Sequence, residues 1–89
     1  VMKKFEDIKW KQHQLGKGNI QGLIMLDSGN ELSIVAGPGM YCMPKEQHNS
    51  PDSFSSFEVA VFDKEGKMMG DPTGWQSREN INTLIKLLN

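Results

Sequence analysis

Cys42 and His48 are the two side chains whose types and spacing could support catalysis. A thiol becomes a nucleophile when a neighbouring base accepts its proton, so a Cys–His pair could supply both functions. The sequence provides no third group to orient such a pair, and the cysteine lies among methionines. We therefore expect an inert thiol and no catalytic residues.

The histidines and the single cysteine also lack the pattern of a metal site. His13 and His48 are far apart, and neither has a cysteine at metal-ligand spacing; Cys42 and His48 alone cannot complete a zinc site. Asp27, Asp52, Asp63 and Asp71 lie in predicted turns, where this residue is expected for backbone reasons, and they lack the spacing of a calcium loop. We expect no metal and no cofactor, and we expect that the protein is not an enzyme.

The stretch best suited to binding runs from Gly37 to Tyr41. It is neither a Walker loop nor a dinucleotide fingerprint, because no Gly-Lys-Ser/Thr follows and no helix is expected to begin after it. Flexible backbone beside an aromatic ring could still cradle and stack a small nucleotide. The candidate binding residues are Gly37, Pro38, Gly39, Tyr41, Met43 and His48.

Three of these candidates, Tyr41, Met43 and His48, lie in a long irregular connection, residues 40–53. Its prolines remove backbone donors and disfavour helix, and loops of this length in so small a domain are often functional or mobile. Two interpretations of its apolar side chains stay open. Met40, Tyr41 and Met43 either close one end of the core or form part of a binding surface.

Composition and charge argue against several classes of protein. Ten basic and eleven acidic residues leave the 89-residue chain near neutral, whereas broad nucleic-acid binding needs a strong positive field. The longest apolar run, residues 23–26, is far short of the roughly 20 residues that span a membrane, and no charged-then-apolar leader opens the chain. A single cysteine fits a reducing compartment, so we expect a cytoplasmic protein without membrane contact.

Residues 20–39 predict the β-hairpin around which the chain is organised. Two apolar-rich strands flank a turn at residues 27–30, whose residue types tolerate the left-handed conformations of a hairpin loop. Apolar side chains fall on both faces near the middle of the hairpin. This pattern indicates a sheet that is covered on one face and partly on the other.

Residues 54–62 alternate as a third strand, residues 63–66 form a second turn, and residues 67–69 begin a short fourth strand. Ser77 is placed to cap a C-terminal helix, and we expect Trp75 to anchor the start of that helix. Apolar residues at helical spacing predict its buried face: Ile81, Leu84, Ile85 and Leu88. The residues expected on its solvent side are Arg78, Asn80, Asn82 and Lys86.

These elements predict a single α+β domain over residues 1–89. Residues 1–19 form an N-terminal arm or a short helix, and residues 20–89 form the hairpins and the helix. We expect an antiparallel sheet of three to four strands, arranged as two hairpins, with the C-terminal amphipathic helix packed on one face. The N-terminal segment, a second copy of the chain or a target could cover the other face.

The stretches IQGLIMLDSGNELSIVAGPGMY and FEVAVFDKEGKMMGDPTGW, followed by a short amphipathic helix, resemble a group of small bacteriophage and prophage proteins. The likeness begins at Ile20 and rests on turns and strands. It departs at the first turn, which has Ser-Gly-Asn in place of Asn-Gly-Tyr, and in the longer loop over residues 43–53. The matching positions are Ile20, Gln21, Gly29, Ser33, Ile34, Val35, Gly37, Pro38, Tyr41, Phe57, Glu58, Val59, Ala60, Val61, Gly74 and Trp75.

The resemblance implies an accessory phage protein made in the host cytoplasm. The leading expectation is a non-enzymatic inhibitor that binds a host antiviral defence protein, as anti-CRISPR proteins do, through the partly apolar sheet face and the Tyr41 loop. One alternative is an oligomeric sponge that sequesters a nucleotide immune signal at residues 37–41, where His48 could contribute to binding. The other alternative is a virion structural or assembly module with no host target.

Overall fold

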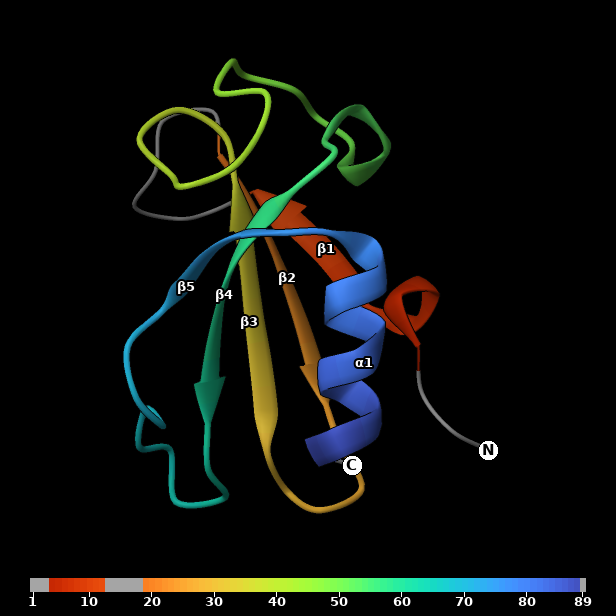
Figure 1. The fold of residues 1–89 in the computed structure, drawn as a ribbon, viewed down its shortest axis with the longest axis vertical. Helices are drawn as coiled ribbons and strands as arrows, with labels where there is room; N and C mark the ends of the chain where they lie inside the picture. The colour runs from red at the N-terminus through yellow and green to blue at the C-terminus, as the bar shows by residue number, and fades with distance from the viewer. Residues whose placement is uncertain (1–3, 13–18, 89) are drawn as a thin grey trace.

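The computed structural model describes residues 4–12 and 19–88. These residues form five strands, one α-helix and two short 3-10 helices (Figure 1). In chain order the elements are η1 (Phe5–Asp7), β1 (Lys9–Gln12), β2 (Ile20–Met25), β3 (Glu31–Ala36), η2 (Pro51–Ser53), β4 (Phe57–Phe62), β5 (Thr73–Gln76) and α1 (Arg78–Leu88).

The strands form one antiparallel sheet in the order β1-β2-β3-β4-β5, so each strand pairs with the next one along the chain. Helix α1 lies over one face of this sheet (Figure 1). The predicted α+β class is confirmed. The predicted number of three to four strands was wrong, because the described residues form five.

The hairpin predicted over residues 20–39 is confirmed as β2 and β3, which pair from Ile20↔Ala36 to Met25↔Glu31. Its turn is closed by the Leu26 amide, which donates to the Asn30 carbonyl at 2.8 Å. Gly29 has a φ of 94°, a conformation that glycine adopts without steric cost.

The N-terminal segment contributes an edge strand that the sequence did not predict. Trp10 of β1 lies opposite Gly22 of β2, and Ile8 and Trp10 fill the space that a side chain at Gly22 would occupy. A four-residue strand with one apolar residue offers too little alternation to be recognised from sequence.

The predicted strand at residues 67–69 was also wrong. Met68 forms an isolated bridge to Phe62, and the strand that pairs with β4 on this side is β5. Gly70 has a φ of 75° and Pro72 lacks an amide donor, so the chain turns before it can extend the pairing. The turn before it is confirmed, because Asp63 Oδ1 accepts from the amides of Glu65 and Lys67 at 2.9 Å each.

Helix α1 begins and ends on contacts that satisfy its terminal backbone groups. Ser77 Oγ accepts from the Asn80 amide at 3.1 Å, which confirms the predicted cap. At the other end, Ser28 Oγ and Asn30 Nδ2 donate to the Leu88 carbonyl, so the β2–β3 turn holds the helix terminus. The predicted apolar stripe faces the sheet, with Ile81 and Ile85 fully buried.

Arg78 and Asn82 do not occupy the solvent side of α1, as the sequence had suggested. The Arg78 guanidinium lies 5.3 Å from the Phe5 ring centroid and 5.4 Å from that of Phe57, and its Nη2 donates to the Pro51 carbonyl at 2.6 Å. Asn82 Oδ1 accepts from the Phe5 amide at 2.7 Å. Both side chains therefore connect the helix to other segments.

The core lies between α1 and the sheet. Residues directly opposite one another in an antiparallel pair point to the same face, so Trp10, Gly22, Ile34 and Val59 form one row across the core side. The buried apolar residues are Phe5, Ile8, Ile20, Ile24, Leu26, Leu32, Ile34, Ala36, Cys42, Phe54, Phe57, Val59, Ile81 and Ile85.

The same registers define the residues that point away from α1, which we call the open face of the sheet. β1 contributes Lys9 and Lys11 to this face. The other strands contribute Gln21, Leu23, Met25, Glu31, Ser33, Val35, Glu58, Ala60 and Phe62. Met40 and Met68 border part of this face, and the Tyr41 amide donates to Glu58 on it, whereas α1 packs on the opposite face (Figure 1). The sequence had predicted partial cover of the second face from the two-sided apolarity of the hairpin.

The contact over Gly22 generates a stability prediction. An added Cβ would overlap Ile8 Cγ2 and lie 3.0 Å from two atoms of the Trp10 ring, and forcing extra volume into a packed core typically costs about 1–3 kcal/mol. We expect Gly22→Ala to lower the free energy of unfolding by that amount in urea denaturation. The loss should shrink in an Ile8→Ala background, which removes the overlapping methyl group; an equal loss in both backgrounds would contradict the account.

Candidate binding site on the Tyr41 loop and strand β5

A β-bulge in β5 determines the shape of the candidate site. The register places Phe57 opposite Gln76 and Val59 opposite Thr73. Gly74 and Trp75 therefore share the position opposite the single residue Glu58. A bulge of this kind bends its strand and redirects the side chains that it carries.

Trp75 is held in an unusual backbone conformation by this bulge. Its φ of 53° places it in the left-handed region, and it is the one non-glycine residue of the described chain found there. For a bulky residue this is a true outlier, and such strain costs of the order of 1–3 kcal/mol. The Trp75 amide donates to the Tyr41 carbonyl at 2.8 Å, which fixes the bulge against the loop.

Trp75 and Tyr41 form an exposed pair of rings, which we call the aromatic pair. Their ring centroids lie 5.1 Å apart with an interplanar angle of 36°. Trp75 is 53% exposed and Tyr41 is 57% exposed. The expectation that Trp75 anchors the start of the helix was therefore wrong.

Two neighbours hold Tyr41 in place beside Trp75. The Tyr41 amide donates to Glu58 Oε1 at 3.0 Å. Gly74 allows the loop to approach β5, because an added Cβ there would lie only 2.5 Å from the Tyr41 Cβ. The aromatic pair is therefore positioned by its backbone and needs little rearrangement to present both rings.

The glycines of the predicted site serve the turn that leads to Tyr41. Gly37 has a φ of 124° and is buried against Asn19, and the Met40 amide donates to its carbonyl at 3.1 Å. Gly39 has a φ of 82° and is exposed, as is Pro38. The structure therefore places Pro38 and Gly39 at the surface and Gly37 in the interior.

Met43 and His48 make contacts elsewhere on the loop. The Met43 carbonyl accepts from the Ser55 amide at 2.8 Å, and its side chain is exposed. His48 packs edge-on against Phe54, with centroids 5.4 Å apart, and its Nε2 lies 3.6 Å from a carboxylate oxygen of Glu46. Met43 and His48 therefore contact other residues than Tyr41 does, and the residue that pairs with Tyr41 is Trp75.

Cys42 is a core residue, which the sequence did not reveal. It has no exposed surface, and its Sγ accepts from the Gly37 amide at 3.2 Å and lies 3.3 Å from the Pro44 carbonyl. Met40 also packs against the core, whereas Tyr41 and Met43 point outward. The loop therefore both closes the core and exposes a surface, so each of the two interpretations holds for part of it.

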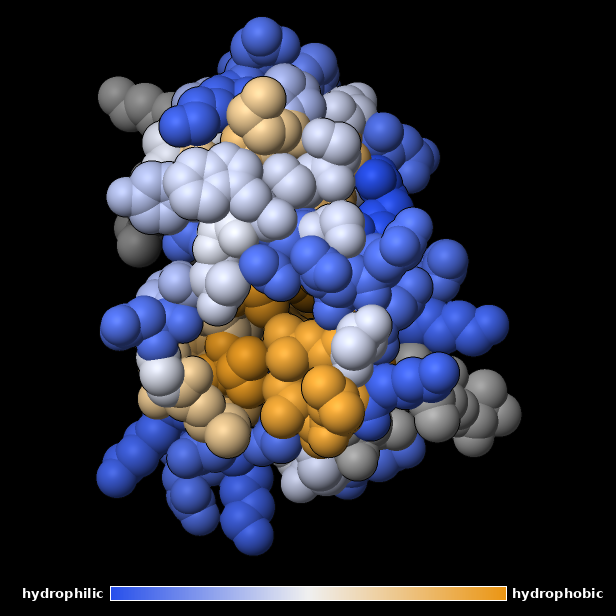
Figure 2. Space-filling view, in the orientation of Figure 1, coloured by the Kyte–Doolittle hydropathy of each residue, from blue (hydrophilic) through white to orange (hydrophobic). Residues whose placement is uncertain are grey.

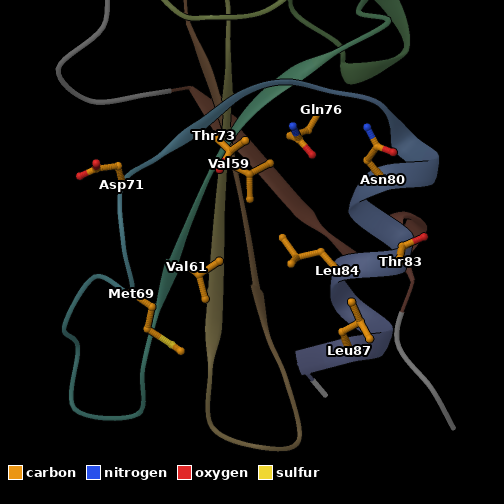
Figure 3. Close-up of a pocket in the computed structure, with 10 residues that line it drawn as sticks. All are labelled: Val59, Val61, Met69, Asp71, Thr73, Gln76, Asn80, Thr83, Leu84 and Leu87. Atoms are coloured by element: carbon orange, nitrogen blue, oxygen red, sulfur yellow. The ribbon is translucent and has the colours of Figure 1, made fainter.

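A second apolar surface lies on the helix side of the molecule. Figure 2 shows a hydrophobic hollow there, and Figure 3 shows Leu84 of α1 pointing toward Val61 of β4. Leu87 of α1 and Met69 also line the hollow. The hollow has a volume of about 310 Å³. It forms because the single helix α1 does not cover the β4–β5 side of the sheet (Figure 1).

Within residues 4–12 and 19–88, no three histidine, cysteine or carboxylate side chains gather as metal ligands would. In the same part of the chain, no helix combines the length and the apolarity needed to cross a bilayer.

Comparisons of the chain with protein-family models, with curated proteins and with solved structures give no match.

The burial of Cys42 predicts its reactivity. A thiol without exposed surface is protected from a bulky disulfide reagent until the protein opens, so we expect Ellman's reagent to modify the folded protein at least about 100-fold more slowly than the urea-unfolded protein. Modification at comparable rates in the two states would contradict the structure and would return Cys42 to the set of candidate nucleophiles.

Because Trp75 is in the left-handed region, we expect the glycine variant at this position to be more stable than the alanine variant, which reverses their usual order of stability. In an ordinary strand, alanine is more stable than glycine by about 0.5–1 kcal/mol, but a left-handed residue with a Cβ costs about 1–2 kcal/mol. We expect Trp75→Gly to be more stable than Trp75→Ala in urea denaturation, by roughly 1 kcal/mol. At Gln76, whose φ is not positive, the same pair of substitutions should show the ordinary order. An alanine variant that is the more stable one at position 75 would contradict the left-handed conformation.

Proposed function

We propose that this protein is a binding module without catalytic activity, and that it docks on another protein through the aromatic pair. The observation that carries the proposal is that the rings of Tyr41 and Trp75 are paired and exposed while a strained bulge holds Trp75 beside the loop. Local strain of this kind concentrates at ligand clamps and other functional positions.

The energetics of the aromatic pair favour a role in binding over a role in stability. Each ring leaves more than half of its surface in water, so the pair gains little from burial within the chain. Tryptophan and tyrosine are enriched among the residues that dominate the affinity of protein interfaces. Because the backbone already positions both rings, docking would immobilise few side-chain rotamers.

We further propose that the partner is a host antiviral defence protein and that binding inhibits it, as anti-CRISPR proteins do. The support is the resemblance of residues 20–89 to phage and prophage accessory proteins, which extends to Tyr41, Gly74 and Trp75. The protein would then act in the host cytoplasm. A nucleotide sponge and a virion module are the competing functions, and the experiment below distinguishes them.

The test compares matched variants in a capture experiment. Tagged protein is incubated with host lysate, the captured protein is purified, and its affinity is measured by calorimetry. We expect Trp75→Gly and Tyr41→Ala to weaken binding by roughly 30-fold or more, since truncating an interface hot spot costs about 2 kcal/mol or more. Met69→Ala, which trims an exposed side chain in the hollow on the helix side, should change the affinity by less than about threefold.

Three outcomes would contradict the proposal. Loss of affinity in Met69→Ala but not in Trp75→Gly would move the docking site to the hollow. Calorimetric heat with a cyclic nucleotide that disappears in Tyr41→Ala would favour the sponge. Presence of the protein in purified virions, without any captured host protein, would favour the virion module.

A further inference from the structure

The open face of the sheet has an ordered distribution of charge. The registers align Lys11, Gln21, Val35 and Glu58 in one row across β1 to β4. The next row contains Lys9, Leu23, Ser33 and Ala60. The basic side chains thus lie on the β1 edge, and the acidic side chain of the first row lies on β4.

Apolar side chains occupy much of the surface between these charges. Leu23, Val35, Ala60 and Phe62 are half-buried, and Met25 is 52% exposed. Unlike the aromatic pair, this surface extends over three central strands; Met40 and Met68 border it on the β3–β4 side, and α1 packs on the opposite face (Figure 1). An extended apolar face with charged flanks is typical of a protein interface.

We infer that a second copy of this chain covers the open face, with a two-fold axis that runs parallel to the strands between β2 and β3. Such an axis places β1 of one copy over β4 of the other, and it keeps each residue row over the same row. Lys11 of each copy then faces Glu58 of the other. Gln21 faces Val35, and Leu23 faces Ser33.

Charge complementarity favours this arrangement over a dimer whose two-fold axis runs perpendicular to the strands. An axis perpendicular to the strands would place β1 over β1, so Lys9 and Lys11 would face the lysines of the second copy at an apolar interface. Like charges brought together in this way are destabilising. Of these two packings, the one with the parallel axis brings the basic edge of each copy over the strand that carries Glu58, and it does so twice because the interface is symmetric.

The geometry of stacked sheets allows the lysine and the glutamate to meet. Packed sheets lie about 10 Å apart and cross at about 30°, distances that long, flexible side chains bridge. Glu58 Oε1 accepts from the Tyr41 amide, which orients the carboxylate, and a carboxylate accepts several hydrogen bonds. Among the described residues Lys11 has no ion-pair partner, so its ammonium group is available to the second copy.

Within one copy, Lys11 and Glu58 are too far apart to interact directly. They lie three strand spacings apart, roughly 14 Å. An energetic coupling between substitutions at these two positions therefore reports contact between copies and not contact within one sheet.

The test is a charge exchange read out by sedimentation equilibrium of the purified full chain. We expect the wild type to be a dimer whose dissociation constant rises with salt concentration. Lys11→Glu and Glu58→Gln should each raise that constant about tenfold or more; Glu58→Gln keeps an oxygen for the Tyr41 amide. Lys11→Glu combined with Glu58→Lys should restore the constant to within about threefold of the wild type. Lys45→Glu, an exposed charge outside the open face, should leave it unchanged.

A monomeric wild type at high micromolar concentration would overturn the inference, and so would Lys11→Glu without effect on the dissociation constant. Failure of the double exchange to restore the dimer would do the same, provided that circular dichroism shows the double variant to be folded. If it is not folded, Lys11→Glu and Glu58→Gln decide the question. This inference does not depend on the proposed function, because Trp75→Gly should weaken partner binding by roughly 30-fold or more and leave the dissociation constant of the dimer unchanged.

Discussion

The packing of Phe57 is the interaction on which the rest of the structure depends. This fully buried ring has its centroid 5.4 Å from that of Phe5 and 5.6 Å from that of Trp10, and the Arg78 guanidinium lies above it. It joins the N-terminal segment, the sheet and the start of α1. A chain of 89 residues buries a limited core, so the contacts of Phe57 are important for packing both η1–β1 and the start of α1 against the sheet. The buried Phe54 extends the same cluster toward the loop.

The strand that carries Phe57 also supports the candidate site on its other side. The residue after it, Glu58, lies opposite the bulge of β5 and accepts from the Tyr41 amide. The core contact and the surface feature are therefore one residue apart on the same strand. β4 pairs with β3 on one side and with β5 on the other, and the β5 bulge holds Trp75 in the left-handed conformation. This arrangement explains how so small a protein keeps two large rings exposed and ordered.

The sequence predicted the elements whose signals are local. The hairpin of β2 and β3 and the cap of α1 at Ser77 were recognised from turn residues and periodicity, and both are confirmed. The edge strands were missed because their pairing depends on distant partners, as in the packing of Trp10 over Gly22. At the candidate site, Tyr41 was identified from its place after a glycine-rich turn. Trp75 was not, because the bulge that turns it outward arises from pairing with β4 and has no signature in the residues around it.

The proposed role of Trp75 as a contact residue presented by the bulge has a direct spectroscopic consequence. Fluorine NMR of protein labelled with 5-fluorotryptophan tests this directly, because the captured partner carries no label. Trp10 and Trp75 give two resonances, which the Trp75→Phe variant assigns. We predict that adding the partner shifts the Trp75 resonance and leaves that of Trp10, packed against Phe5 and Phe57, in place. A complex that forms while the Trp75 resonance does not move would contradict the account.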